Sequence, residues 1–259
     1  MRLRFLLSRR WVLFFLAVVF MAWGAVRLGE WQFHRLHDRE QRNAWTERNL
    51  AADPAPVADV LSSDAPLPES REWQRVTATG TYDPSGTFVV RYQTRDGDGG
   101  VDVVTPLLLE GGGAVLVDRG WMSTQDPRTG PEDTPAPPPG RVQVKGWARA
   151  DSTGDKSSIT DASTREISSR AAVDRVDAPL LHGFVDLQEE SPSPATALVP
   201  ADLPDLGEGP HLFYGIQWWF FGALALGGFG YLVWDEARGG PDAVRNRAGS
   251  RRRRASPHR

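Results

Sequence analysis

The sequence contains no cysteine in its 259 residues. Disulfide bonds, thiolate metal sites and thiol catalysis are therefore excluded, together with the paired-thiolate chemistry of copper chaperones. Common enzyme signatures are also missing: the chain has no G-x-S-x-G, no Walker loop, no G-x-G-x-x-G and no H-E-x-x-H. These absences argue against an enzyme and favour a binding or assembly protein.

Only two stretches of the chain are both long and apolar. Residues 11–26 hold no charge over 16 positions, and residues 212–234 hold none over 23. A bilayer core about 30 Å thick requires roughly 20 apolar residues in a helix. We predict transmembrane helices over 11–29 and 211–234. A cleaved signal peptide is the alternative for the first stretch, but it has no clear cleavage site, and Trp23 and Trp31 suit a membrane–water interface.

Charge is distributed unevenly along the chain. Residues 30–210 contain 17 basic and 30 acidic residues, whereas both ends are rich in arginine. Because basic flanks stay inside, we predict a cytoplasmic N-terminus (1–10), a basic cytoplasmic tail (235–259) and an extracytoplasmic middle, in a multi-pass protein of a bacterial plasma membrane. The arginines at 251–254 could also bind anionic lipid. No basic, aromatic-studded domain accompanies them, so nucleic-acid binding is not expected.

The middle of the chain reads as a β-rich domain. Residues 30–50 continue the first helix, and a short helix follows over 57–61. Alternating apolar residues and turn signals then predict a hairpin over 75–95, a second hairpin around Gly111–Gly113 and a strand over 141–150. We expect a mobile polar insert over 151–177, a short helix at 178–181 and a strand over 183–187. The predicted fold class is membrane α+β, with two transmembrane helices flanking an antiparallel sheet or partly closed barrel.

Five histidines are the candidate metal or cofactor ligands. His258 lies in the basic tail, and His182 is expected in a loop. His34 and His37 are three residues apart on the helix beyond the first span, where a solvated helix surface is the simpler interpretation. No protein-bound metal site is predicted.

His211 differs from the other histidines because it opens the second apolar helix. At helical spacing it shares one stripe with Tyr214, Gly215, Trp218 and Gly222. One imidazole above aromatic faces and small residues is typical of a surface that holds a flat metal macrocycle. The alternative is an aromatic belt with glycines for helix packing, in which Ala223 and Gly227 form the small-residue pair.

Four segments resemble those of one known family. These are "LGEWQFHRL" (28–36), "VVTPLLL" (103–109), "VLVDRGWMS" (115–123) and "HLFYGIQWW" (211–219). In this order, and with two spans, they are similar to signatures of the Surfeit-locus family of cytochrome c oxidase assembly factors. Asp118 stands where members usually have Asn, Ser123 where they have Pro, and Gly-Pro where Asn often precedes the histidine.

The resemblance implies a function and a set of partners. It implies delivery or insertion of haem a into oxidase subunit I, with haem a synthase and membrane lipid as further partners. The family's haem-binding histidine and tryptophan correspond to His211 and Trp218, and the stripe adds Tyr214. The competing hypothesis is a scaffold without cofactor, whose outer domain holds oxidase subunits together. In that case Arg119 and Trp121 would serve the interface or, as we favour, the fold.

Overall fold

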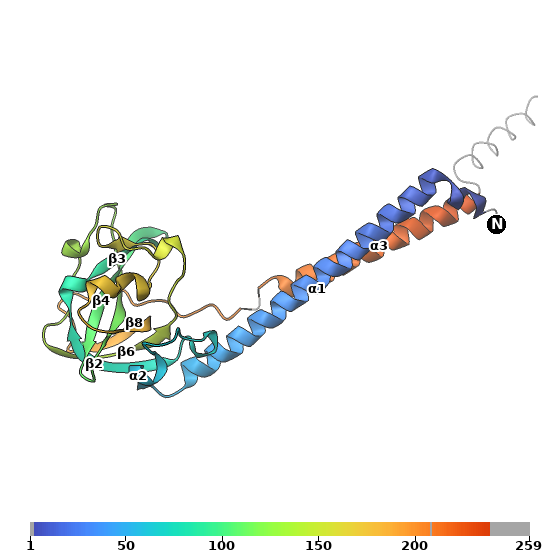
Figure 1. The fold of residues 1–259 in the computed structure, drawn as a ribbon. Helices are drawn as coiled ribbons and strands as arrows, with labels where there is room; N and C mark the ends of the chain where they lie inside the picture. Colours follow the sequence, from blue (N-terminus) through green and yellow to red (C-terminus); the bar gives the residue numbers. More distant parts are fainter. Residues whose placement is uncertain (1–2, 208, 239–259) are drawn as a thin grey trace, which may run out of the picture. The chain divides into compact units, whose positions relative to one another are not determined.

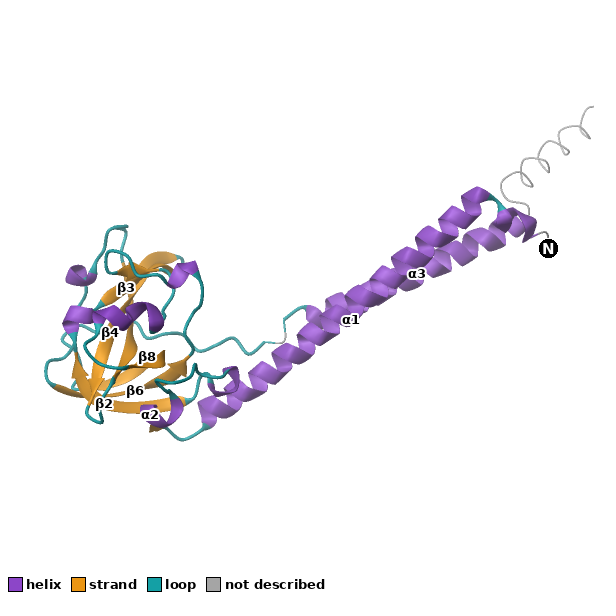
Figure 2. Cartoon of the chain, in the orientation of Figure 1, coloured by secondary structure: helices purple, strands orange, loops and turns teal. Residues whose placement is uncertain are grey.

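A computed structural model describes residues 3–207 and 209–238. The chain divides into two compact units, which are described separately (Figures 1 and 2). A helical unit contains the residues up to Glu40 and those from Gly207, and a β unit contains Gln41–Leu206. The predictions for the tail after residue 238, and for His258 within it, lie outside the described residues.

The helical unit is built on two long helices. After a short turn, η1 (Leu3–Leu7), helix α1 (Arg9–Ala51) extends far beyond the predicted span, and α3 (His211–Ala237) follows near the end of the chain. The first proline is Pro54, so no ring interrupts the backbone hydrogen bonds of α1 before its end. Both helices are long and apolar enough to cross a membrane, although their placement in one stays a prediction.

The β unit is an eight-stranded sheet that closes on itself. Its described strands are β1 (Ala55–Pro56), β2 (Arg75–Tyr82), β3 (Phe88–Arg95), β4 (Asp98–Leu109), β5 (Ala114–Ser123), β6 (Arg141–Arg149), β7 (Ser163–Thr164) and β8 (Leu180–Ser191). The order is β1-β2-β6-β8-β5-β4-β3-β7, and a further pairing of β2 with β4 closes a ring. Most neighbours are antiparallel, which confirms the antiparallel-rich, barrel-like prediction. The long strands β5 and β8 run parallel, as do the two-residue strands β1 with β2 and β7 with β3.

The pairing of β4 corrects one predicted hairpin. Strands β2 and β3 are consecutive and separated by the turn η3 (Pro84–Gly86), but they are not paired with each other among the described strands. The first part of β4 pairs with β3, and its last residues pair with β2 instead. The 12-residue strand β4 therefore pairs with β3 and then with β2 along the same edge. The turn at η3 is a corner of the barrel. The hairpin of β4 with β5 is confirmed.

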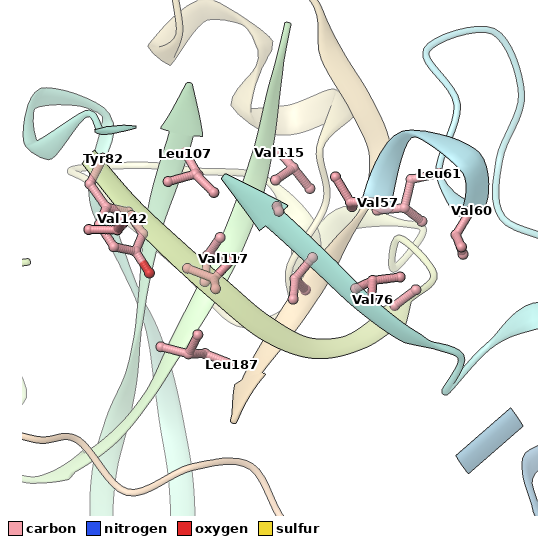
Figure 3. Close-up of a cluster of buried hydrophobic side chains, with 14 of the residues drawn as sticks. Val57, Val60, Leu61, Val76, Tyr82, Leu107, Val115, Val117, Val142 and Leu187 are labelled. Carbon is pink, nitrogen blue, oxygen red and sulfur yellow. The ribbon is translucent and has the colours of Figure 1, made fainter. Parts of the chain in front are cut away.

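The barrel interior forms the larger core (Figure 3). Val115, Val117, Val142 and Val144 point inward from β5 and β6 and are fully buried. The short helix α2 (Val57–Val60) adds Val57 and Val60 to this cluster, close to where the sequence predicts it. Each fully buried valine or leucine stabilises the fold by about 1.5–3 kcal/mol. Strand β6 alternates between buried and less buried residues, whereas β5 is buried on both faces because its Leu116 packs in the second core.

A second core corrects the interpretation of residues 151–177. This segment contains η5 (Asp155–Ser157), β7 and η6 (Arg170–Arg175), and its Ile167, Ala172 and Val176 are buried against Phe88 and Leu116. The segment is therefore part of the fold rather than a polar excursion from it. Three scattered apolar residues suffice because the barrel wall supplies the rest of the cluster. The helix predicted at 178–181 is wrong, since β8 begins at Leu180 and the helical turn is η6.

Candidate functional site

The candidate site lies where α3 begins. Gly209 has a left-handed backbone (φ +68°), which favours glycine, and Pro210 follows as the helix N-cap residue. The backbone N–H of Tyr214 donates to the Pro210 carbonyl oxygen at 3.1 Å, which starts the helical ladder. The Arg39 side chain of α1 donates to the Gly207 carbonyl oxygen just before this turn. The local sequence therefore places His211 as the first residue of the helix.

The His211 imidazole is held by the neighbouring helix. Its Nδ1 lies 2.9 Å from the side-chain oxygen Oε1 of Gln32 on α1. An amide oxygen can only accept, so Nδ1 carries the proton and donates it, and the lone pair lies on Nε2. Nε2 has no hydrogen-bond partner among the residues that the structure describes, and the side chain is only half-buried. Nδ1 is thus hydrogen-bonded within the protein, and Nε2 is available to bind a ligand.

Glycines bring the two helices together around this pair. A Cβ at Gly215 would lie 2.9 Å from the Phe33 ring, and a Cβ at Gly222 would lie 3.2 Å from the Cβ of Ala25. The Phe33 ring packs against Trp219 with its centroid 4.8 Å away. Close packing through small residues is the usual way for apolar helices to associate.

This packing corrects the interpretation of the glycine stripe. Gly215 and Gly222 face α1, so they do not form an open surface for a macrocycle. The packing alternative is right about the role of glycine but wrong about the position, because a Cβ at Gly227 would meet no described atom within 4 Å.

The other two predicted residues lie one and two turns further along α3. Tyr214 is 48% exposed, and Trp218 is half-buried with its ring edge-on to Phe221 at 6.1 Å. His211 is therefore the member of the predicted set that is bonded to α1. The arrangement fits a single nitrogen ligand, with the exposed Tyr214 ring and the half-buried Trp218 ring further along the same helix.

The remaining histidines do not gather into a metal site. His34 and His37 are exposed on α1, and His37 lies beside Glu40 at 3.8 Å. His182 belongs to strand β8 rather than a loop, and its Nδ1 is 3.5 Å from the Ser169 hydroxyl oxygen. Across residues 3–207 and 209–238, no group of three or more His, Cys, Asp or Glu side chains could hold a metal ion.

Comparison with known proteins places this geometry in a family. The sequence model of the SURF1 family matches residues 19–223, which include both Gln32 and His211. The chain belongs to the SURF1 family. Uncharacterised SURF1-like proteins of Mycobacterium bovis and of Mycobacterium tuberculosis strains CDC 1551 and H37Rv are each 31% identical to it over 246 residues, covering 92% of this chain and 88% of theirs. The SURF1 family is associated with cytochrome c oxidase assembly, and its members are generally not enzymes.

The four segments that resemble the SURF1 family meet in pairs. Residues 28–36 of α1 contact residues 211–219 of α3 through Gln32 and His211, Phe33 and Gly215, and Gly29 and Trp219. Residues 103–109 and 115–123 are the paired strands β4 and β5. Gln32 was missed as a site residue from the sequence alone. The sequence feature that could have identified Gln32 is its position within residues 28–36, the first segment that resembles the family.

The β4–β5 pair also carries a buried polar cluster that sequence reasoning missed. Asp102, Asp118 and Asp186 lie on β4, β5 and β8 and are all buried. Arg95 contacts Asp102 at 3.1 Å, and Arg149 pairs with Asp186. Burial raises the pKa of Asp102 to about 6, against the opposing effect of Arg95. Burial also raises the pKa of Asp186, although Arg149 acts to lower it.

The neighbouring residues Arg119 and Trp121 serve the fold of this SURF1-family domain. Both are buried, with 4% and 8% of their surface exposed. Arg119 donates to the backbone carbonyl oxygens of Pro135 and Ala136, at 2.8 and 3.3 Å. The backbone of Trp121 exchanges two hydrogen bonds with Val199. These contacts tie two proline-rich loops to β5, which is the role that we favoured from the sequence.

Proposed function

We propose that this SURF1-family protein assists the delivery or insertion of haem a into subunit I during assembly of cytochrome c oxidase. His211 carries the proposal, because its Nε2 is an unused nitrogen ligand at the polar end of an apolar helix pair. Bound haem would supply an iron that accepts a nitrogen ligand. His211 would hold that iron, and the Tyr214 and Trp218 rings would contact the apolar macrocycle.

Moderate affinity is the property that such a handover requires. A carrier can transfer its cargo only if the recipient binds that cargo more tightly. A single imidazole ligand on a half-buried ring suits transient binding. The remaining proposed features are two membrane crossings, a plasma-membrane location and contacts with haem a synthase and lipid. The two apolar helices and the arginine-rich ends support them.

The test compares two histidine variants in purified protein and in cells. His211→Ala should lose most of the haem a binding that the wild-type protein shows by absorbance titration, because the axial ligand is gone. His34→Ala is the matched control, since His34 is an exposed histidine on α1. In a strain that lacks the gene, His34→Ala should restore the haem a band in reduced-minus-oxidised membrane spectra, and His211→Ala should not.

Two results would contradict this proposal, the first its ligand and the second haem delivery itself. If His211→Ala and wild type bind haem a with equal spectra, His211 is not the ligand. If neither binds haem a, yet both restore oxidase assembly equally, the scaffold hypothesis replaces delivery.

A further inference from the structure

We infer that Gln32 is a positioning residue for haem binding, which presents Nε2 of His211 to the iron and sets its strength as a ligand. This inference rests on the proposed function and adds to it a residue on the other helix. Gln32 and His211 are 179 positions apart, and their side chains meet through one hydrogen bond of 2.9 Å.

Gln32 decides which nitrogen is available. A neutral imidazole carries its proton on either Nδ1 or Nε2, and the hydrogen bond made by one nitrogen selects the tautomer. Since the Gln32 oxygen accepts from Nδ1, the lone pair that an iron requires lies on Nε2. Without Gln32 the ring could rotate and exchange tautomers, because no other side chain is hydrogen-bonded to His211 within the described residues.

The surroundings hold Gln32 in place and leave Nε2 accessible. On α1, Gly29 accommodates the Trp219 ring and Phe33 fills the space at Gly215, so contacts on both sides of Gln32 set the register of the helices. A Cβ at Gly209 would be in ordinary contact with the ring, 3.5 Å from Cδ2 and 3.7 Å from Nε2, so glycine at this position keeps a side chain away from Nε2. A functional ligand held by packed helices and one outer hydrogen bond is pre-organised.

An amide also suits a ligand that must release its cargo. A carboxylate that accepts from Nδ1 raises the basicity of the imidazole and strengthens its bond to a metal. The neutral Gln32 oxygen orients the ring with a weaker effect. The inference therefore predicts that removing the acceptor, as in Gln32→Leu, weakens the bond between His211 and iron. Replacing it with a charged acceptor, as in Gln32→Glu, strengthens that bond.

The experiment uses the full-length protein with haem a and compares Gln32→Leu, Gln32→Glu and the control Gln217→Leu. Gln217 is an exposed glutamine on α3. Gln32→Leu should weaken haem a binding about 10- to 100-fold and lower the iron–histidine stretching frequency in resonance Raman spectra. Gln32→Glu should raise this frequency, lower the midpoint potential and slow release to an acceptor haem protein. Gln217→Leu should match the wild type.

The outcomes separate the two proposals. If Gln32→Glu and Gln32→Leu both retain the wild-type frequency, potential and affinity, Gln32 has no role at the ligand, and haem binding by His211 still stands. If both variants shift alike, Gln32 acts through helix packing alone and the inference is wrong. If the wild-type protein binds no haem a, or binds it without His211, both proposals fall.

Discussion

Asp118 is a buried carboxyl whose pKa departs far from its ordinary value. It is buried in β5, and its Oδ1 accepts a hydrogen bond from the backbone N–H of Gly120 at 3.0 Å. Burial raises its pKa well above the usual range, and the charges of Asp102 and Asp186 raise it further. In the described structure it has no direct ion pair. In its protonated form, Asp118 would resemble the asparagine that the family resemblance implies at this position.

Asp118→Asn should remove part of the pH dependence of stability. Between the ordinary pKa and the raised one, the unfolded chain loses a proton that the folded protein keeps, so the free energy of unfolding falls as the pH rises. Asparagine has no such proton. We expect the variant to gain stability relative to wild type from about pH 4 upward, by about 1.4 kcal/mol for each unit of pKa shift removed.

Denaturant unfolding of the full-length protein in detergent, followed by tryptophan fluorescence between pH 5 and pH 9, would measure this gain. Asp98→Asn on the exposed end of β4 is the control. If the Asp118→Asn and wild-type curves stay parallel over this range, Asp118 is not a neutral acid in the fold.

At the scale of elements, the pairing of α1 with α3 depends on glycines, whose lack of a side chain lets the helices approach closely. A Cβ at Gly222 already lies 3.2 Å from Ala25, whereas one at Gly228 would meet no described atom within 4 Å. Gly222→Leu should therefore separate the helices at a cost of about 1–3 kcal/mol, the usual range for overpacking. Gly228→Leu is the matched control on the same helix.

The distance between two spin labels would report this separation. The chain has no cysteine, so cysteines introduced at the exposed Leu13 and Leu232 would be the sole labelling sites. Gly222→Leu should lengthen or broaden the distance distribution, and Gly228→Leu should not. Identical distributions in both variants would show that Gly222 does not hold the pair together.

At the scale of the whole molecule, charge predicts the orientation. The segment 30–210 is acidic, and both flanks are rich in arginine. Because positive flanks are retained inside, a fluorescent protein fused to the C-terminus should fold in the cytoplasm and fluoresce. Alkaline phosphatase inserted at the exposed turn Gly111–Gly112 should be active outside. A C-terminal fusion that does not fluoresce, together with an inactive phosphatase insertion, would reverse the topology and place His211 at the inner face.

Local patterns in the sequence determined the long helices and most of the long strands of this protein, but not the elements within residues 151–181. Uncharged length specifies α1 and α3, and alternation specifies the strands, because burial of one face acts over a few neighbouring residues. The β4–β5 hairpin was predictable for the same reason, since its glycine turn joins strands that are adjacent in sequence. Family resemblance and an unusual position at a helix start were enough to select His211.

Only the tertiary structure decided which elements and side chains meet. The pairing of β2 with β4, the parallel pairing of β5 with β8 and the core contacts of Ile167 all join segments that are not neighbours in sequence. The same holds for Gln32 with His211, and for the carboxylates on three strands. Such contacts depend on how whole surfaces fit after the chain has closed. A short window of sequence indicates whether each residue prefers to be buried, but it does not indicate which distant residue it will contact.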